Sequence, residues 1–241
     1  MPSAKARPAR SGALDVSGFR VAAESRAAGG LLGGDFYRLL PHAPGRMGVV
    51  IGDTCGQGPV AAGFFEAVKP HLDALVCAQP SPAVLLTELN RVASRLLPLD
   101  RFITAAAFEF DARAGRLTIA NAGHVPAIIR SVNGDVAVVG EASGPPLGFE
   151  REFRYRDEDH ELRRGDVVVM MTDGLLEAVE LDLTSMGTLR RWLAQGPAEA
   201  VTVHRLLLGK LEEETARRHE DDMTLVTLET PRESLPPPSI H

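Results

Sequence analysis

Two short apolar runs, each followed by an aspartate beside glycine, constrain this chain more than any other feature of its sequence. Met47–Ile51 leads into Asp53, and Val167–Met171 leads into Asp173. Short apolar runs rich in β-branched residues and bounded by glycine are typical of buried strands. A buried strand fixes the carboxylate at its end, and the neighbouring glycine lets a ligand or another backbone come close.

Other segments show strand or helix periodicity between turn signals. Further strands are predicted at Phe19–Ala23, Asp35–Leu40, Ile103–Phe110, Arg116–Ala120, Ala127–Ser131, Val136–Val139, Phe153–Leu162 and Met223–Glu229. Helices are predicted at Val60–Val76, Pro82–Leu97 with Ser81 as the N-cap, Thr184–Leu193 and Pro197–Arg218. Strands outnumber helices, and regular βαβ alternation is missing from this pattern. The fold class is therefore predicted as α+β, with packed antiparallel sheets covered by helices.

Composition narrows the domain organisation and the function class. A net charge of −6 argues against a nucleic-acid partner, which normally meets a basic face. Cys55 and Cys77 have no zinc spacing, and no apolar run approaches the ~18 residues of a membrane span. We expect a cytoplasmic protein with no membrane partner. Residues 1–17 are predicted as a flexible tail, 18–230 as one domain and 231–241 as a Pro-rich flexible tail.

Acidic residues stand beside turns or strand ends at four separate places, Asp35, Asp53, Asp173 and the pair Asp221-Asp222. An aspartate in a turn is often structural, because its side chain bonds to nearby backbone. If these four places converged, the carboxylates would raise one another's pKa, and protonation or bound cations would be needed. Oxygen ligands without histidine or cysteine suit Mg²⁺, Mn²⁺ or Ca²⁺ rather than zinc. A pair of such ions suits phosphate chemistry.

Five motifs occur in one order along the chain. They are GGDFY (Gly33–Tyr37), VIGDTCGQG (Val50–Gly58), NAGH (Asn121–His124), GDVVVMMTDGLLEA (Gly165–Ala178) and DDMTLV (Asp221–Val226). Together they resemble the SpoIIE/RsbU branch of the PPM-type phosphatases, bacterial relatives of protein phosphatase 2C. The resemblance implies a β-sandwich of two antiparallel sheets flanked by α-helices. It also implies two Mn²⁺ or Mg²⁺ ions at one end of the sandwich, and hydrolysis by an activated water without a phosphoenzyme.

The same resemblance assigns roles to single residues. Asp35 and Asp173 are each expected to bind one metal, and Asp53 is expected to bridge both, which makes these three the catalytic aspartates. The backbone carbonyl of Thr54 is a further expected ligand, and Asp221 is expected to complete the second metal site. Asp222 directly follows Asp221, so the sequence leaves a swapped role between the two open.

The chain departs from the family pattern at two places. Arg38 follows GGDFY where many relatives have an acid, which removes an accessory metal contact or supplies a positive charge near phosphate. Thr54 and Cys55 stand where the eukaryotic branch has a histidine after the bridging aspartate, so the general acid is unassigned. His124 is either a turn residue bonded to backbone or a catalytic contact. A nucleophilic role for Cys55 is disfavoured, because nearby carboxylates raise a thiol pKa.

The leading functional hypothesis is a serine/threonine protein phosphatase. The resemblance implies a phosphorylated anti-sigma-factor antagonist of the STAS type as substrate, in stress-related sigma-factor regulation. It also suggests regulation by a separate protein or by self-association as a homodimer. The alternative is a partner-binding module of the same fold with impaired catalysis. A haloacid-dehalogenase-type phosphatase would need a second acid in a D-x-D arrangement, and Asp53-Thr54-Cys55 does not supply one.

Overall fold

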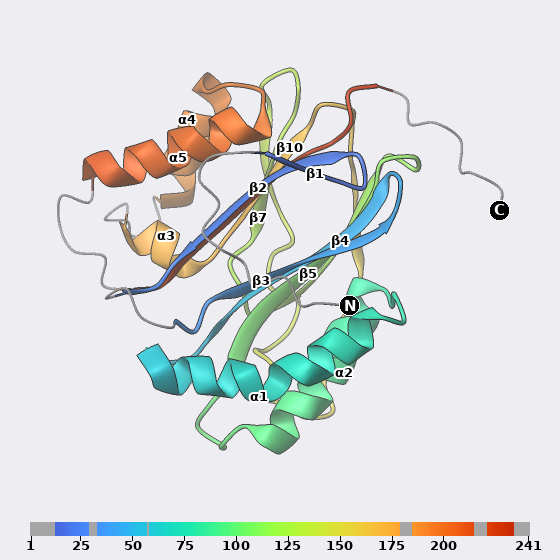
Figure 1. Ribbon diagram of the computed structural model, residues 1–241, viewed down its shortest axis with the longest axis vertical. Coiled ribbons are helices and arrows are strands. Elements are labelled where there is room, and N and C mark those ends of the chain that lie inside the picture. Colours follow the sequence, from blue (N-terminus) through green and yellow to red (C-terminus); the bar gives the residue numbers. More distant parts are fainter. Residues whose placement is uncertain (1–12, 29–32, 57, 179–184, 215–220, 234–241) are drawn as a thin grey trace.

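The computed structural model of this chain describes residues 13–28, 33–56, 58–178, 185–214 and 221–233. Within these residues, two β-sheets pack face to face, and helices cover the outer face of each sheet (Figure 1). Every pair of neighbouring strands in either sheet is antiparallel. This arrangement confirms the predicted α+β sandwich.

The first sheet has six strands among the described residues, in the order β1-β2-β11-β10-β7-β8. Their bounds are β1 Leu14–Val16, β2 Phe19–Arg26, β11 Met223–Glu229, β10 Val167–Met171, β7 Ala127–Arg130 and β8 Val136–Val139. Strands β8, β10 and β11 have the predicted bounds. Residue Met171 of β10 pairs with Leu225 of β11, so the end of one strand lies beside the start of the other.

The second sheet has five strands among the described residues, in the order β3-β4-β5-β6-β9. Their bounds are β3 Phe36–Ala43, β4 Arg46–Thr54, β5 Ile103–Asp111, β6 Arg116–Ala122 and β9 Glu158–Glu161. Strands β3 and β4 form a hairpin in which Phe36 pairs with Gly52. This register brings the residues just before β3 next to the end of β4.

The helices form the two outer layers (Figure 1). Their bounds are α1 Gly58–Val76, α2 Pro82–Leu96, α3 Asp173–Ala178, α4 Ser185–Gln195 and α5 Ala200–Glu214. Helices α1 and α2 pack on the five-stranded sheet, while α4 and α5 pack on the six-stranded sheet. The predicted cap is confirmed, because the Ser81 hydroxyl accepts from the Val84 N–H at 3.5 Å and Pro82 begins α2. No helix of the described ranges is long and apolar enough to span a membrane.

Strand alternation divides the apolar residues among three cores. In β4, Val49 and Ile51 point into the core between the two sheets, whereas Val50 points into the core beneath α1 and α2. In β10, Val168 and Met170 face the sandwich interior, while Val169 faces α4 and α5. Because successive side chains of a strand point to opposite faces, each central strand is buried on both sides. This explains why these strands read as continuous apolar runs.

The structure corrects three sequence predictions. Strand β1 (Leu14–Val16) pairs with β2, so these residues belong to the sheet and not to the tail predicted for residues 1–17. Only Glu158–Glu161 of the predicted strand Phe153–Leu162 is extended and paired, as β9. Helix α3 begins directly at Asp173, in a segment where no helix was predicted. Thr184, the predicted start of one helix, lies outside the described residues. So do residues 215–218, the predicted end of another.

The segment just before β9, which contains Phe153 and Tyr155, stays irregular because its aromatic side chains are packed without strand pairing. Phe153 and Tyr155 pack edge to face, with ring centroids 5.0 Å apart, and the Tyr155 hydroxyl donates to the Pro145 carbonyl at 2.7 Å. Their burial comes from contacts with the α2 side of the sandwich rather than from a strand ladder. A weakly alternating sequence does not distinguish these two ways of burying an aromatic residue.

Candidate functional site

The acidic motifs meet at one end of the sandwich. Asp53 has the same strand parity as Val49 and Ile51, so its side chain lies on the inner face of the five-stranded sheet. Asp35, one residue before β3, has the parity of Tyr37, which also packs against the inner core. Asp173 follows β10 in the facing sheet. Strand alternation thus aims Asp35 and Asp53 inward, whereas Asp173 is placed by the start of helix α3.

The raised pKa values of Asp35 and Asp53 reflect how close these carboxyl groups lie to other acidic residues. The pKa of Asp53 is raised to about 8, first by burial and then by repulsion from Asp35, Asp173, Asp221 and Asp222. The pKa of Asp35 is raised to about 7, again first by burial, with hydrogen bonds from Thr172 and Thr224 opposing the shift. Burial and like charge both disfavour an ionised carboxylate. Four distant segments therefore form one negatively charged cluster.

Asp221 and Asp222 are distinguished by their hydrogen bonds. The Asp222 carboxylate is buried and accepts from the backbone N–H groups of Ala28 at 2.7 Å and Gly34 at 2.6 Å. Asp222 therefore holds the chain that leads into Asp35. Among the described residues, the Asp221 carboxylate accepts a hydrogen bond from the Asp222 N–H at 2.8 Å. Burial and the repulsion of Asp173 raise its pKa. Of the two, Asp221 keeps the more available carboxylate.

Asp35 is attached to the opposite sheet by one side of its carboxylate. The Thr172 hydroxyl donates to Asp35 Oδ2 at 2.7 Å. The other oxygen, Oδ1, is buried and has no hydrogen-bond partner among the described residues. Buried carboxylate oxygens are normally satisfied, so an unpaired one calls for an explanation. A cation or an ordered water bound at Oδ1 would provide it.

Gly34 lets the Asp53 segment come unusually close. A Cβ atom on Gly34 would lie 2.7 Å from the Thr54 carbonyl oxygen and 2.9 Å from Asp53 Oδ1. Both oxygens therefore border the same small space beside the Gly34 backbone. Thr54 itself is fully buried, and its N–H donates to the Gly34 carbonyl at 3.3 Å. The Thr54 carbonyl and the Asp53 carboxylate are thus on the same side of the strand end.

The donor chemistry of the cluster fits a hard divalent cation. Its oxygens come from carboxylates and one backbone carbonyl, which is the ligand type that Mg²⁺ and Mn²⁺ prefer. Among the described residues, no three His, Cys, Asp or Glu side chains already stand in an arrangement that could hold a metal ion. The unpaired Asp35 Oδ1 and the raised pKa values are the observations that support the fit.

The remaining residues singled out by sequence lie in supporting positions. The Arg38 side chain is on the α1 side of β3, with Nε 3.5 Å from Asp73 and the guanidinium 5.6 Å from the Phe65 ring centroid. This is the opposite strand parity from Asp35. Cys55 Sγ accepts from the Phe102 N–H at 3.2 Å and so stabilises the loop after β4. His124 is buried, with Nδ1 3.0 Å from the Thr104 hydroxyl.

Sequence reasoning missed two residues at the site. Thr172 bonds Asp35, and its hydroxyl also accepts from the Thr224 N–H at 2.8 Å. Glu177 lies near enough to Asp221 and Asp173 that burial and their charges raise its pKa. The only sequence signal was position: Thr172 and Glu177 flank Asp173. Threonine is common in strands and glutamate in helices, so neither residue type drew notice.

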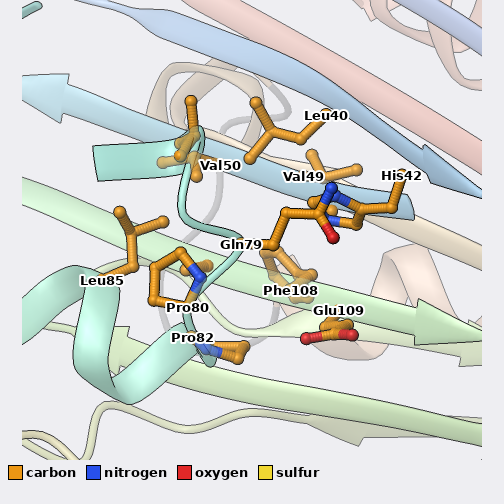
Figure 2. Close-up of a pocket in the computed structure, with 13 residues that line it drawn as sticks. Leu40, His42, Val49, Val50, Gln79, Pro80, Pro82, Leu85, Phe108 and Glu109 are labelled. Atoms are coloured by element: carbon orange, nitrogen blue, oxygen red, sulfur yellow. The ribbon is translucent and has the colours of Figure 1, made fainter. Parts of the chain in front are cut away.

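A separate small pocket lies outside this cluster. Figure 2 shows it between the outer face of the five-stranded sheet and the loop that joins α1 and α2, with Leu40, Val50, Gln79 and Leu85 among its lining residues. None of the clustered aspartates lines it. Its volume is about 20 Å³, which is room for a single water molecule. It is too small to serve as a substrate site.

Comparison with known proteins identifies the family. Residues 43–231 match the family model described as Stage II sporulation protein E (SpoIIE). The phosphoserine phosphatase RsbU of Bacillus subtilis is 28% identical over 165 residues, which cover 68% of this chain and 47% of RsbU. The chain spans about half the length, or less, of the curated relatives that it matches.

Solved structures show the same fold. The RsbU and RsbW domains of a Mycobacterium tuberculosis protein align with a TM-score of 0.78 and 26% identity, covering 91% of this chain and 62% of that one. The PP2C phosphatase domain of SpoIIE from Bacillus subtilis aligns with a TM-score of 0.75 and 19% identity, covering 90% and 64%. These alignments extend over both sheets of the sandwich.

Two further structures of this fold contain metal ions. The catalytic domain of the serine/threonine phosphatase PstP was solved with two manganese ions, and it aligns with a TM-score of 0.58 and 19% identity over 88% of this chain and 97% of that one. RsbX was solved with magnesium, and it aligns with a TM-score of 0.67 and 17% identity over 88% and 94%. Because the family model covers most of the sequence and the sandwich is shared, this chain belongs to the SpoIIE family, within the SpoIIE/RsbU branch of the PPM-type phosphatases.

Proposed function

We propose that this chain is a metal-dependent serine/threonine protein phosphatase. The observation that carries the proposal is the cluster of Asp35, Asp53, Asp173 and Asp221, which come from separate parts of the sequence and whose crowding helps to raise the pKa values of Asp35, Asp53 and Asp221. A cluster of like charges in which Asp35 and Asp53 are largely removed from water is costly to the fold unless it binds something positive. Membership of a phosphatase family supplies the kind of reaction.

In this proposal Asp53 would be the ligand shared by two divalent cations, Mn²⁺ or Mg²⁺. Asp35 and the Thr54 carbonyl complete one set of ligands, and Asp173 and Asp221 complete the other. The approach of the Thr54 carbonyl and Asp53 Oδ1 to the same space beside Gly34 supports the pairing of these two groups. Asp222 already accepts hydrogen bonds from two backbone N–H groups. This supports Asp221, rather than Asp222, as the metal ligand.

The residues of the chain prepare the site for phosphate ester hydrolysis. When bound, a pair of divalent cations lowers the pKa of a water nucleophile and neutralises charge on the phosphoryl oxygens. Thr172 orients the Asp35 carboxylate through a 2.7 Å hydrogen bond, and Asp222 fixes the preceding backbone. These contacts hold the carboxylates in place before a ligand arrives. Preorganisation of this kind lowers the cost of reaching the charged transition state.

The proposed substrate is a protein that carries phosphoserine or phosphothreonine, and within that class a STAS-type anti-sigma-factor antagonist. The likeness to the phosphoserine phosphatase RsbU supports the class of substrate. The likeness to a structure that contains RsbU and RsbW domains supports a role in sigma-factor regulation.

The test is hydrolysis of p-nitrophenyl phosphate and of a phosphoserine peptide, with and without Mn²⁺. The wild-type chain is compared with Asp53→Asn, which removes the shared ligand, and with Asp135→Asn in the exposed β7–β8 turn as the matched control. We expect Mn²⁺-dependent turnover in the wild type and the control, and at least a 100-fold loss in Asp53→Asn at unchanged circular dichroism. A near wild-type rate in Asp53→Asn would show that the bridging role is wrong.

The same assay separates the alternative function. If the wild type hydrolyses neither substrate with Mn²⁺ present, yet binds a phosphorylated STAS domain, then the chain is a binding module. The position of Arg38 gives this alternative little support, because its guanidinium faces Asp73 and Phe65 on the outer side of the sheet.

A further inference from the structure

His124 lies where the chain crosses from one sheet to the other. It sits in the loop between β6 of the five-stranded sheet and β7 of the six-stranded sheet. Only 5% of the residue is exposed. Its imidazole Nδ1 lies 3.0 Å from the Thr104 hydroxyl. A histidine buried between two sheets is not available as a surface contact for substrate.

The backbone around His124 is held rigidly by Asn121. The Asn121 side-chain oxygen accepts from the His124 N–H at 2.7 Å, and its amide donates to the His124 carbonyl at 2.9 Å. The same amide donates to the Gly140 carbonyl at 2.7 Å. Two of these three hydrogen bonds fix the turn, and the third attaches it to Gly140. The imidazole therefore projects from a backbone with little freedom to move.

The ring contacts the ends of two strands that carry site aspartates. Thr104 of β5 is the ladder partner of Asp53 in β4. On its other side, the backbone of Met171, the last residue of β10, interacts with the imidazole and opposes the fall of its pKa. Asp173 follows Met171 by two residues. His124 thus stands between the strand end that carries Asp53 and the strand end that carries Asp173.

We propose that His124 is a positioning residue that sets the separation of Asp53 and Asp173 and thereby the affinity of the carboxylate cluster for divalent cations. This inference rests on the proposed function of the same cluster. Its Nε2 is buried and forms no hydrogen bond of normal geometry in the described part of the chain. The ring therefore acts mainly as a spacer whose one firm bond is to Thr104.

The charge state of His124 suits this role. Burial lowers its pKa to about 4, so the ring stays neutral at the pH where the enzyme would work. A neutral imidazole adds no positive charge that would compete with a bound cation. Groups that orient metal ligands without touching the metal commonly change metal affinity about 10–100-fold when they are replaced.

The chain offers a matched control in His204. This residue of α5 is also buried, its Nδ1 lies 3.3 Å from the Thr227 hydroxyl, and burial lowers its pKa to about 4. It packs between α5 and the six-stranded sheet, and its pKa shows no influence of the clustered aspartates. The two histidines share burial, charge and threonine contact, and differ in their relation to the site.

The test measures Mn²⁺ binding by titration calorimetry for the wild type, His124→Leu and His204→Leu, together with the thermal midpoint of each metal-free protein. We expect Mn²⁺ affinity to fall about 10-fold in His124→Leu and to stay within 2-fold in His204→Leu, although both lose stability. If His124→Leu does not fold, His124→Asn replaces it. Asparagine keeps a polar atom near the position of Nδ1, and we expect an affinity loss of about 3-fold to 10-fold.

Three results would overturn the inference. Wild-type affinity in the folded His124 variant would show that the ring is only a core residue. An equal loss of affinity in His204→Leu would show that general destabilisation is the cause. Absence of Mn²⁺ binding by the wild type would instead remove the proposed metal-dependent function, and this inference with it.

Discussion

The Thr172 hydroxyl donates a 2.7 Å hydrogen bond to the Asp35 carboxylate and joins the two sheets at the acidic end of the sandwich. The same hydroxyl oxygen accepts the backbone N–H of Thr224 at 2.8 Å. Thr172 and Thr224 belong to the six-stranded side, whereas Asp35 leads into β3 of the other sheet. The position of Asp35 is therefore set by the sheet to which it does not belong.

Replacing Thr172 by valine tests this connection. We expect Thr172→Val to lower the free energy of unfolding by about 1–3 kcal/mol, because the buried Thr224 N–H loses its acceptor and Asp35 its donor. Urea denaturation followed by circular dichroism measures the change. Thr118→Val is the control, since Thr118 of β6 donates at 2.6 Å to Asp159 of the edge strand β9 in an exposed hydrogen bond. Equal losses in the two variants would argue against a special role of Thr172.

The stability of the metal-free protein should fall as pH rises from about 6.5 to 8. The folded-state pKa values of Asp35 and Asp53 are raised from 3.8 to about 7 and 8. In this window the folded chain holds protons that the unfolded chain has released, so raising the pH favours unfolding. His124 and His204 have folded-state pKa values lowered to about 4, so they oppose this slope near pH 6.5, where the unfolded imidazoles are still partly protonated, and add almost none above about pH 7.5.

Urea titrations in EDTA at pH 6.5, 7.5 and 8.5 check this prediction. We expect a loss on the order of 1–2 kcal/mol across the range, since one proton difference per pH unit is worth about 1.4 kcal/mol. Added Mn²⁺ should flatten the profile, because a bound cation replaces the protons. Asp53→Asn should flatten it without metal. A stability that rises with pH in EDTA would contradict the assigned pKa shifts.

Gly34→Ala tests the close approach at the end of β4. A Cβ at this position would stand 2.7 Å from the Thr54 carbonyl oxygen and 2.9 Å from Asp53 Oδ1, so the backbone must shift. We expect Mn²⁺ affinity to fall at least 10-fold and stability to drop by about 1–3 kcal/mol. Gly63→Ala in α1 is the control, because nothing lies within 4 Å of its Cβ position. Alanine there should stabilise the helix by about 0.5–1 kcal/mol.

The two adjacent aspartates before β11 should respond differently to removal of charge. Asp222→Asn weakens the acceptor of two backbone N–H groups, Ala28 and Gly34, and should lower the free energy of unfolding by about 1–3 kcal/mol. Asp221→Asn should leave stability nearly unchanged in EDTA but weaken Mn²⁺ binding. Thermal melts with and without Mn²⁺ compare the two variants. The opposite pattern would exchange the roles assigned to them.

Local sequence pattern was sufficient for the strands and for the direction of their side chains. The bounds of β8, β10 and β11 follow from short β-branched runs between turn signals, and the parity of Asp53 with Val49 and Ile51 follows from strand alternation. These features depend on neighbouring residues and on the two-residue period of a strand. By contrast, β1 is a strand only because the edge of β2 is available to pair with it.

Tertiary structure decided how the acidic residues meet. Thr172 and Asp35 are 137 positions apart, and no local period relates them. The order of the strands in the two sheets brings them into contact. The same packing places the Asp222 carboxylate where it accepts a backbone N–H, and it buries His124 between strand ends. By itself the sequence determined which residues are acidic and which face of a strand Asp35 and Asp53 occupy. Only the packing of one sheet on the other determined which carboxylates share a site, because their repulsion, burial and hydrogen bonds depend on distances across the sandwich.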